Sequence, residues 1–161
     1  RRSSDLNHFL ESFRGTLFRQ TMFAEFEQKA HEMAATGESL TSQSLCSIYK
    51  KLNEDYFGPD TVTDPEIQYE WERIPHFYTP FYVYQYATGF SAAIAISRKI
   101  FNGEPGILEG YRKFLSGGCC DTPIELLKLA GVDMSHTGPV EEALKFFEEL
   151  LNEFEELVHR F

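Results

Sequence analysis

Apolar side chains recur at steps of three and four residues through the first part of the chain. The series comprises Leu6, Phe9, Leu10, Phe13, Leu17, Phe18, Phe23, Phe26, Ala30 and Met33. This spacing is typical of one apolar stripe along an α-helix. We therefore predict a helix from near Ser4 to Gly37, where glycine ends it. Because this span exceeds the usual length of a globular helix, we expect a kink at Gly15.

Glycine and proline divide the rest of the chain into further helices. We predict helices over residues 42–57, 65–71, 81–101, 107–115, 123–130 and 139–158. Thr41 and Asp64 are candidate N-caps, because their side-chain oxygens can accept free backbone N–H groups. In the last helix, Leu144, Leu151 and Val158 are among the residues that we expect to face inward.

The fold class that follows is all-α, a compact multi-helix bundle. No segment keeps the alternation of apolar and polar residues that marks a strand. The loops between the predicted helices are short, as in helix bundles. A chain of 161 residues is expected to form one domain with a single core.

Composition and charge argue against some classes of partner and favour one cellular compartment. The formal net charge of -10 would repel a phosphate backbone, which argues against nucleic acid. No apolar run approaches the roughly 18 residues needed to span a membrane. The three cysteines, Cys46, Cys119 and Cys120, show no zinc-binding spacing. Reduced thiols in a cytoplasmic protein fit this pattern.

Half of the tyrosines lie within residues 74–90, IPHFYTPFYVYQYATGF. They are Tyr78, Tyr82, Tyr84 and Tyr86, and His76 stands just before them. A phenol can donate a hydrogen bond to a developing oxyanion, and so can a suitably oriented imidazole. The segment is therefore the candidate functional site of the chain.

The predicted helix from residue 81 would bring two of these tyrosines together. Tyr82 and Tyr86 would lie one turn apart on one face, and Tyr84 would point roughly the other way. Pro75 and Pro80 restrict the backbone around His76. Aromatic side chains at helical spacing are more often part of a core, and spacing alone leaves both interpretations open.

Four segments of the chain resemble a known family in unbroken order. They are RGTLFRQTMFAEFE (residues 14–27), LTSQSLCSIYKKLNEDYFG (40–58), WERIPHFYTPFYVYQYATGFSAA (71–93) and LKLAGVDM (127–134). Together with the acidic final helix, they are similar to the C-terminal region of zinc oligopeptidases of peptidase family M3, of the oligoendopeptidase F type. The resemblance implies a larger helical metallopeptidase fold with a central channel, which hydrolyses short oligopeptides.

In that family, zinc is held by the two His of an HExxH motif and by a later Glu, and the Glu of HExxH is the general base. This chain lacks the motif. Its nearest approach is His31-Glu32 followed by Met33, Ala34 and Ala35, with Ala in place of the second His. We interpret His31 and Glu32 as surface or cleft residues and expect no metal ligand here. The resemblance thus implies that residues 1–161 are a C-terminal subdomain, and that the Zn²⁺ site of the parent lies upstream.

The resemblance also implies roles for the aromatic segment. His76, Tyr82 and Tyr86 are the expected catalytic residues, which bind substrate and stabilise the oxyanion. Tyr78 and Tyr84 are expected to bind substrate. Which tyrosine meets the carbonyl is left open.

The expected partners are short peptides and the missing upstream part of the enzyme, and self-association through exposed apolar surface is a further possibility. The chain alone is expected to be inactive. The alternative function is a non-catalytic helical module that binds a peptide or a partner helix.

Overall fold

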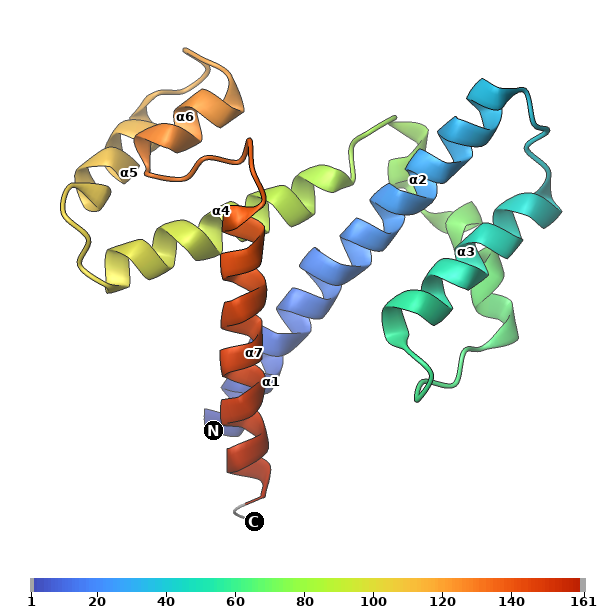
Figure 1. Ribbon diagram of the computed structural model, residues 1–161, viewed down its shortest axis with the longest axis horizontal. Helices are drawn as coiled ribbons and strands as arrows, with labels where there is room; N and C mark the ends of the chain where they lie inside the picture. Colours follow the sequence, from blue (N-terminus) through green and yellow to red (C-terminus); the bar gives the residue numbers. More distant parts are fainter. Residues whose placement is uncertain (1, 160–161) are drawn as a thin grey trace. The chain divides into compact units, whose positions relative to one another are not determined.

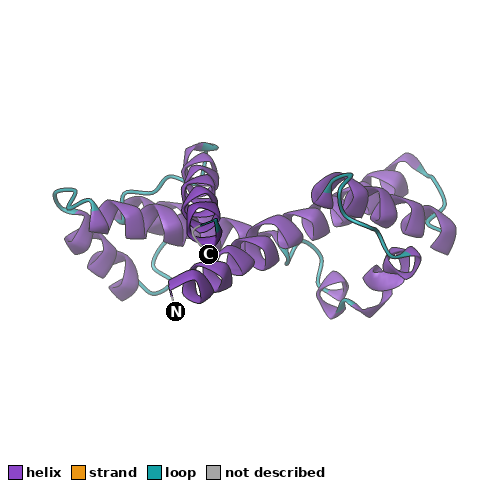
Figure 2. Cartoon of the chain, turned by 90° about the horizontal axis from the view of Figure 1, so that it is seen from below, coloured by secondary structure: helices purple, strands orange, loops and turns teal. Residues whose placement is uncertain are grey.

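Every regular element in the described part of the chain is helical. The computed structural model describes residues 2–159, and no strand occurs within them (Figures 1 and 2). The α-helices are α1 (Arg2–Phe13), α2 (Arg19–Thr36), α3 (Ser42–Phe57), α4 (Tyr84–Phe101), α5 (Ile107–Ser116), α6 (Pro123–Leu129) and α7 (Gly138–Val158). The π-helical segment η1 (Arg14–Phe18) and the 3₁₀-helices η2 (Pro65–Arg73) and η3 (Pro75–Tyr78) complete the series. The prediction of an all-α fold is confirmed.

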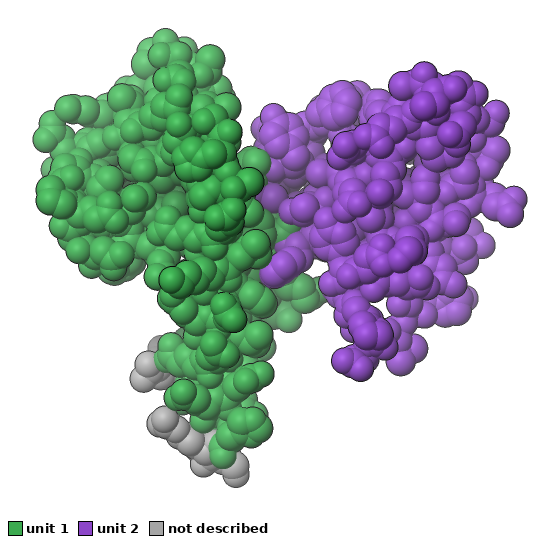
Figure 3. Space-filling view, in the orientation of Figure 1, with its two compact units in different colours: residues 1–17, 88–161 green, residues 18–87 purple. Residues whose placement is uncertain are grey.

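The described residues divide into two compact units, which Figure 3 colours separately. Unit 1 contains the chain up to Leu17 and from Thr88 onward, and unit 2 contains Phe18–Ala87. This differs from the single core expected from chain length. Buried apolar side chains of residues 22–83 and of residues 92–132 pack into separate clusters, one in each unit. None of the described helices combines the length and the apolar character that crossing a bilayer requires.

Unit 2 is built on α2 and α3, which pack against each other, and η2 packs against α3. Its buried cluster comprises Met22, Phe23, Phe26, Tyr49, Leu52, Ile74 and Val83. The rings of Phe26 and Tyr49 meet edge to face, with centroids 5.2 Å apart. Burying a large apolar side chain contributes about 1.5–3 kcal/mol, so this cluster anchors the aromatic stretch, residues 74–90, through Ile74 and Val83.

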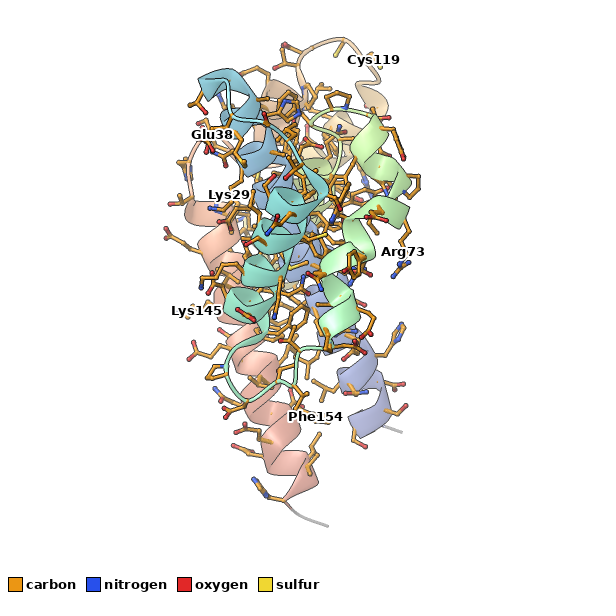
Figure 4. All side chains as sticks on the ribbon, turned by 90° about the vertical axis from the view of Figure 1, so that its right-hand side faces the viewer. Lys29, Glu38, Arg73, Cys119, Lys145 and Phe154 are labelled. Atoms are coloured by element: carbon orange, nitrogen blue, oxygen red, sulfur yellow. The ribbon has the colours of Figure 1, made fainter. Side chains whose placement is uncertain are left out.

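A buried carboxylate joins three elements of unit 2. Tyr49 Oη donates to Glu70 Oε2 over 2.7 Å, and the Arg19 guanidinium donates to Glu70 Oε1 over 2.6 Å. Arg73 also pairs with this carboxylate, although its side chain is mostly exposed (Figure 4). Burial raises the pKa of Glu70, but the hydrogen bonds from Tyr49 and Arg19 outweigh this effect. The pKa of Glu70 therefore lies below its ordinary value.

Unit 1 combines α1 with α7 and α5 with α6. Phe13 of α1 is fully buried and meets the ring of Phe90 edge to face, with centroids 4.9 Å apart. A separate buried cluster comprises Ala92, Ala95, Ile96, Ala130 and Val132. The contact of α5 with α6 requires glycine at one position, because a Cβ on Gly110 would lie 2.1 Å from the carbonyl oxygen of Leu129.

Local sequence signals predicted most helix ends correctly. The Thr41 side chain accepts the Ser44 N–H at the start of α3, and Gly37, with a φ of 82°, ends α2. The Asp64 side chain caps the next segment, which is a 3₁₀-helix. Gly15, where we expected a kink, lies in the π-helical segment η1 between α1 and α2.

The predicted start of α4 was wrong. The helix begins at Tyr84, because Phe81 has a φ of 58° and a right-handed helix cannot include that conformation. For a residue with a side chain, the left-handed region costs about 1–2 kcal/mol. Contacts from elsewhere in unit 2 must therefore stabilise Phe81.

The inward face predicted for α7 was also partly wrong. Leu144, Leu151 and Val158 are exposed. Within unit 1, the buried side of α7 instead carries Ala143, which is 0% exposed, and Phe146, whose ring lies 6.0 Å from that of Phe9. The strip of α7 that packs against α1 is thus narrower than the whole apolar face of α7.

Candidate functional site

Ile74, Phe77 and Val83 attach the aromatic segment, residues 74–90, to the core of unit 2. Phe77 of η3 packs against Phe23 and Phe26, with ring centroids 5.6 Å and 5.3 Å away. Val83, just before α4, is fully buried in the same cluster. Between these anchors, the intervening side chains are free to face outward. This explains why residues of one short segment alternate between core and open surface.

A turn before α4 sets the positions of two tyrosines. The Gln85 N–H donates to the Tyr82 carbonyl over 3.3 Å, and the Tyr86 N–H donates to the Val83 carbonyl over 3.2 Å. The chain therefore already turns at Tyr82, although the helix starts later. As a result, Tyr82 and Tyr86 meet as the four-residue spacing predicted, even though the predicted helix start was wrong.

Three of the five predicted site residues contact one another, and we call them the Tyr/His cluster: His76, Tyr82 and Tyr86. The rings of His76 and Tyr82 stack with centroids 5.7 Å apart and an angle of 12° between planes. Tyr86 meets both rings nearly at right angles, at 5.8 Å from His76 and 5.6 Å from Tyr82. The cluster is thus an ordered arrangement of two phenols and one imidazole.

Hydroxyl contacts within the Tyr/His cluster are long. Tyr86 Oη lies 3.4 Å from His76 Nε2 and donates to Tyr82 Oη over 3.4 Å. Hydrogen bonds between oxygens are commonly about 2.7–2.8 Å, so these contacts are weak. Tyr82 and Tyr86 are each 37% exposed. Their hydroxyls can therefore exchange these contacts for stronger ones to a bound molecule.

The Tyr86 hydroxyl is a phenol and is protonated at neutral pH. The hydrogen bond with Tyr82 raises the pKa of Tyr86 above its ordinary value, and desolvation acts in the same direction. A phenol with a raised pKa retains its proton at neutral pH. Tyr86 is therefore available as a hydrogen-bond donor.

The two remaining predicted residues lie at more open positions. Tyr78 ends η3 and is 83% exposed, whereas Tyr84 is the first residue of α4 and is 51% exposed. Both belong to the same segment as the Tyr/His cluster. Their role in substrate binding stays a prediction.

Sequence reasoning missed a buried acid beside this segment. Glu27 of α2 is 6% exposed and its Oε1 accepts the backbone N–H of Phe81. The signal was present, since Glu27 lies four residues after Phe23 and thus on the buried side of α2. A charged residue on an apolar stripe is rare unless it is paired.

The partial HExxH match is explained by other contacts. The His31 ring lies 4.7 Å from the Phe81 ring, and Glu32 Oε1 accepts a hydrogen bond from Gln28 Nε2 over 2.8 Å. Within residues 2–159, no group of three His, Cys, Asp or Glu side chains is arranged to hold a metal ion.

Comparison with known proteins identifies relatives for nearly the whole chain. The model of peptidase family M3 matches residues 2–146. The chain is 52% identical over 155 residues to oligoendopeptidase F, chromosomal, of Lactococcus lactis subsp. cremoris, covering 96% of this chain and 26% of that protein. It is 55% identical over 154 residues to oligopeptidase PepF of Bacillus subtilis, covering 95% of this chain and 23% of that protein. The chain thus spans about a quarter of the length of these curated relatives.

The fold agrees with a solved relative. The crystal structure of oligoendopeptidase-F from Enterococcus faecium superposes with a TM-score of 0.97 at 52% sequence identity. This match covers 99% of the chain and 31% of the solved chain. The family model covers well over half of the sequence. The chain therefore belongs to peptidase family M3.

Proposed function

We propose that this chain is part of a zinc endopeptidase that hydrolyses short peptides, in which the Tyr/His cluster binds the substrate and stabilises the oxyanion. The observation that supports it most is the convergence of His76, Tyr82 and Tyr86 at a partly exposed place. The names of the relatives, oligoendopeptidase F and oligopeptidase, give the substrate class. The alternative of a binding module without chemistry is not favoured, because these relatives are peptidases by name.

The hydrogen-bond donors of the Tyr/His cluster suit the stabilisation of an oxyanion. Attack on a peptide carbonyl places negative charge on its oxygen, and donors directed at that oxygen stabilise the transition state. Tyr82 and Tyr86 can each supply an O–H, and His76 can supply an N–H in the matching tautomer. Their rings hold each other in place, so little reorganisation is needed when the substrate binds.

Zinc belongs outside this chain in our proposal. The ion would serve as a Lewis acid and activate water, and we assign its ligands to the remainder of the parent enzyme. The partners proposed for the chain are accordingly the rest of that enzyme and short peptides. We place the enzyme in the cytoplasm. The three cysteines of this chain form no disulfide, and Cys119 and Cys120 are exposed, as expected in a reducing compartment.

Removing single hydroxyls tests the role of the cluster. In a full-length enzyme that contains this chain, we expect Tyr82→Phe or Tyr86→Phe to lower kcat by about 10²–10³-fold, with an unchanged melting temperature. The larger loss marks the tyrosine that meets the oxyanion. Tyr69→Phe, at an exposed position on η2, is the matched control and should keep the wild-type kcat.

Unchanged catalysis in the variants of the cluster would refute this role. If kcat is unchanged in Tyr82→Phe, in Tyr86→Phe and also in His76→Ala, the cluster has no part in catalysis. Peptide binding without turnover by the full-length, zinc-loaded enzyme would favour the module without chemistry instead.

A further inference from the structure

We propose that Glu27 is a positioning residue for the Tyr/His cluster: its buried carboxylate fixes Phe81 in a left-handed conformation and thereby directs Tyr82 toward His76 and Tyr86. This inference rests on the proposed function, since it names a residue that acts through the cluster. Glu27 itself makes no ring contact or hydrogen bond with the cluster among the described contacts.

The backbone at Phe81 needs an external contact to persist. Within the described part of the chain, Phe81 is the only residue other than glycine with a positive φ, at 58°. Left-handed backbone is unfavourable for a residue with a Cβ, and it survives where surrounding contacts determine it. Phe81 is 56% exposed, so burial of its side chain does not supply that contact.

Two side chains of α2 supply it. Glu27 Oε1 accepts the Phe81 N–H, a contact between residues 54 apart in sequence. The His31 ring lies against the Phe81 ring, with centroids 4.7 Å apart and planes inclined by 31°. Because Glu27 and His31 are four residues apart, they lie on one face of α2. One face of a packed helix thus contacts both the backbone and the ring of Phe81.

The carboxylate is poorly suited to a purely stabilising role. Glu27 is 6% exposed, and within residues 2–159 no donor pairs with its buried Oε2. A buried acid with one unpaired oxygen is unfavourable for folding, and an apolar residue would pack there at lower cost. The other oxygen of Glu27, Oε1, is nevertheless held on the backbone N–H of Phe81. The role of Glu27 is therefore to hold the backbone of Phe81 in place, and it does not lie in a gain of folding stability.

Tyr82 depends directly on this geometry. It follows Phe81 in the chain, and the next residue, Val83, is fully buried. With Val83 anchored, the dihedral angles at Phe81 decide the path of the chain into Tyr82. A return of Phe81 to negative φ would move the Tyr82 ring away from its stack with His76, 5.7 Å between centroids.

The test uses Glu27→Leu in the full-length enzyme, because leucine keeps the volume and removes the acceptor. We expect kcat to fall about 10- to 100-fold with a smaller change in KM, since a displacement of about 1 Å can cost about 10²-fold. The melting temperature should not fall. Glu27→Gln keeps a carbonyl acceptor and should recover most of the loss. Glu32→Leu, on the exposed side of the same helix, should match wild type.

A crystal structure of the Glu27→Leu enzyme separates this inference from the proposed function. A lost stack of Tyr82 on His76 together with a lower kcat supports both. A lost stack with wild-type kcat supports the positioning role and refutes the catalytic role of the cluster. An intact stack overturns the positioning role, whatever the kcat. If Glu27→Leu does not fold, Glu27→Ala is judged by the same criteria.

Discussion

Tyr49 and Tyr86 lie in the same unit and carry the same hydroxyl, yet they differ in burial and in the length of their hydrogen bonds. Tyr49 is 0% exposed, and its hydroxyl donates to Glu70 over 2.7 Å. Tyr86 is 37% exposed, and its hydroxyl lies 3.4 Å from both Tyr82 Oη and His76 Nε2. Burial raises the pKa of Tyr49, and the hydrogen bond to Glu70 raises it further.

This difference in burial and hydrogen-bond length shows that Tyr49 stabilises the fold, whereas the hydroxyl of Tyr86 is free to bind a ligand. A buried hydroxyl must be hydrogen-bonded, and a short bond to a carboxylate leaves nothing to offer a ligand. A partly exposed hydroxyl with long contacts can be hydrogen-bonded by water or by a ligand. Losing Tyr49 should therefore affect stability, whereas losing Tyr86 should affect only catalysis. The fluorescence of Trp71, the single tryptophan of the chain, reports on unfolding of this unit.

The largest effect on stability should come from removing the acceptor of Tyr49. Glu70→Ala removes the buried carboxylate that accepts from both the partly exposed Arg19 guanidinium and the buried Tyr49 hydroxyl. Breaking a buried pair in this way typically costs about 3–5 kcal/mol. Urea unfolding followed by Trp71 fluorescence measures the loss. A loss below about 1 kcal/mol would place this network with ordinary surface pairs.

A smaller effect should follow from removing one donor. Tyr49→Phe leaves Glu70 paired with arginine but lacking one hydrogen bond, at a cost of about 1–3 kcal/mol. Tyr86→Phe should change the same free energy of unfolding by less than about 0.5 kcal/mol. Equal losses in the two variants would erase the distinction between the two tyrosines.

The smallest expected effect is on the pH dependence of the free energy of unfolding in acid. The pKa of Glu70 is lower in the folded chain than in the unfolded chain, so the unfolded chain binds more protons between the two values. The stability from this carboxyl is complete above the unfolded pKa, about 4.3, and is lost as the pH falls through the folded value. We expect Glu70→Gln to flatten the acid dependence of urea unfolding in that window. Parallel curves for the variant and wild type would contradict the assignment.

The candidate site shows how far sequence reasoning reaches. The pairing of Tyr82 with Tyr86 followed from their spacing, and the family resemblance selected them together with His76. The start of α4 and the left-handed Phe81 were not predicted, because the partner of Phe81 is Glu27, 54 residues away. Spacing also did not distinguish Tyr78, which is 83% exposed, from the clustered tyrosines. Long-range contacts decide these points, and local patterns do not report them.

The amino-acid sequence alone determined the all-helical class, the C-terminal end of α2, both ends of α3, and the family, because caps, apolar periodicity and short motifs act through neighbouring residues. Only the tertiary structure decided that the buried side chains form two clusters, that Glu70 is a shared acceptor, and that Glu27 meets Phe81. The reason is physical. A backbone conformation that is unfavourable on its own, or a buried charge, becomes stable only through partners that folding brings from distant parts of the chain.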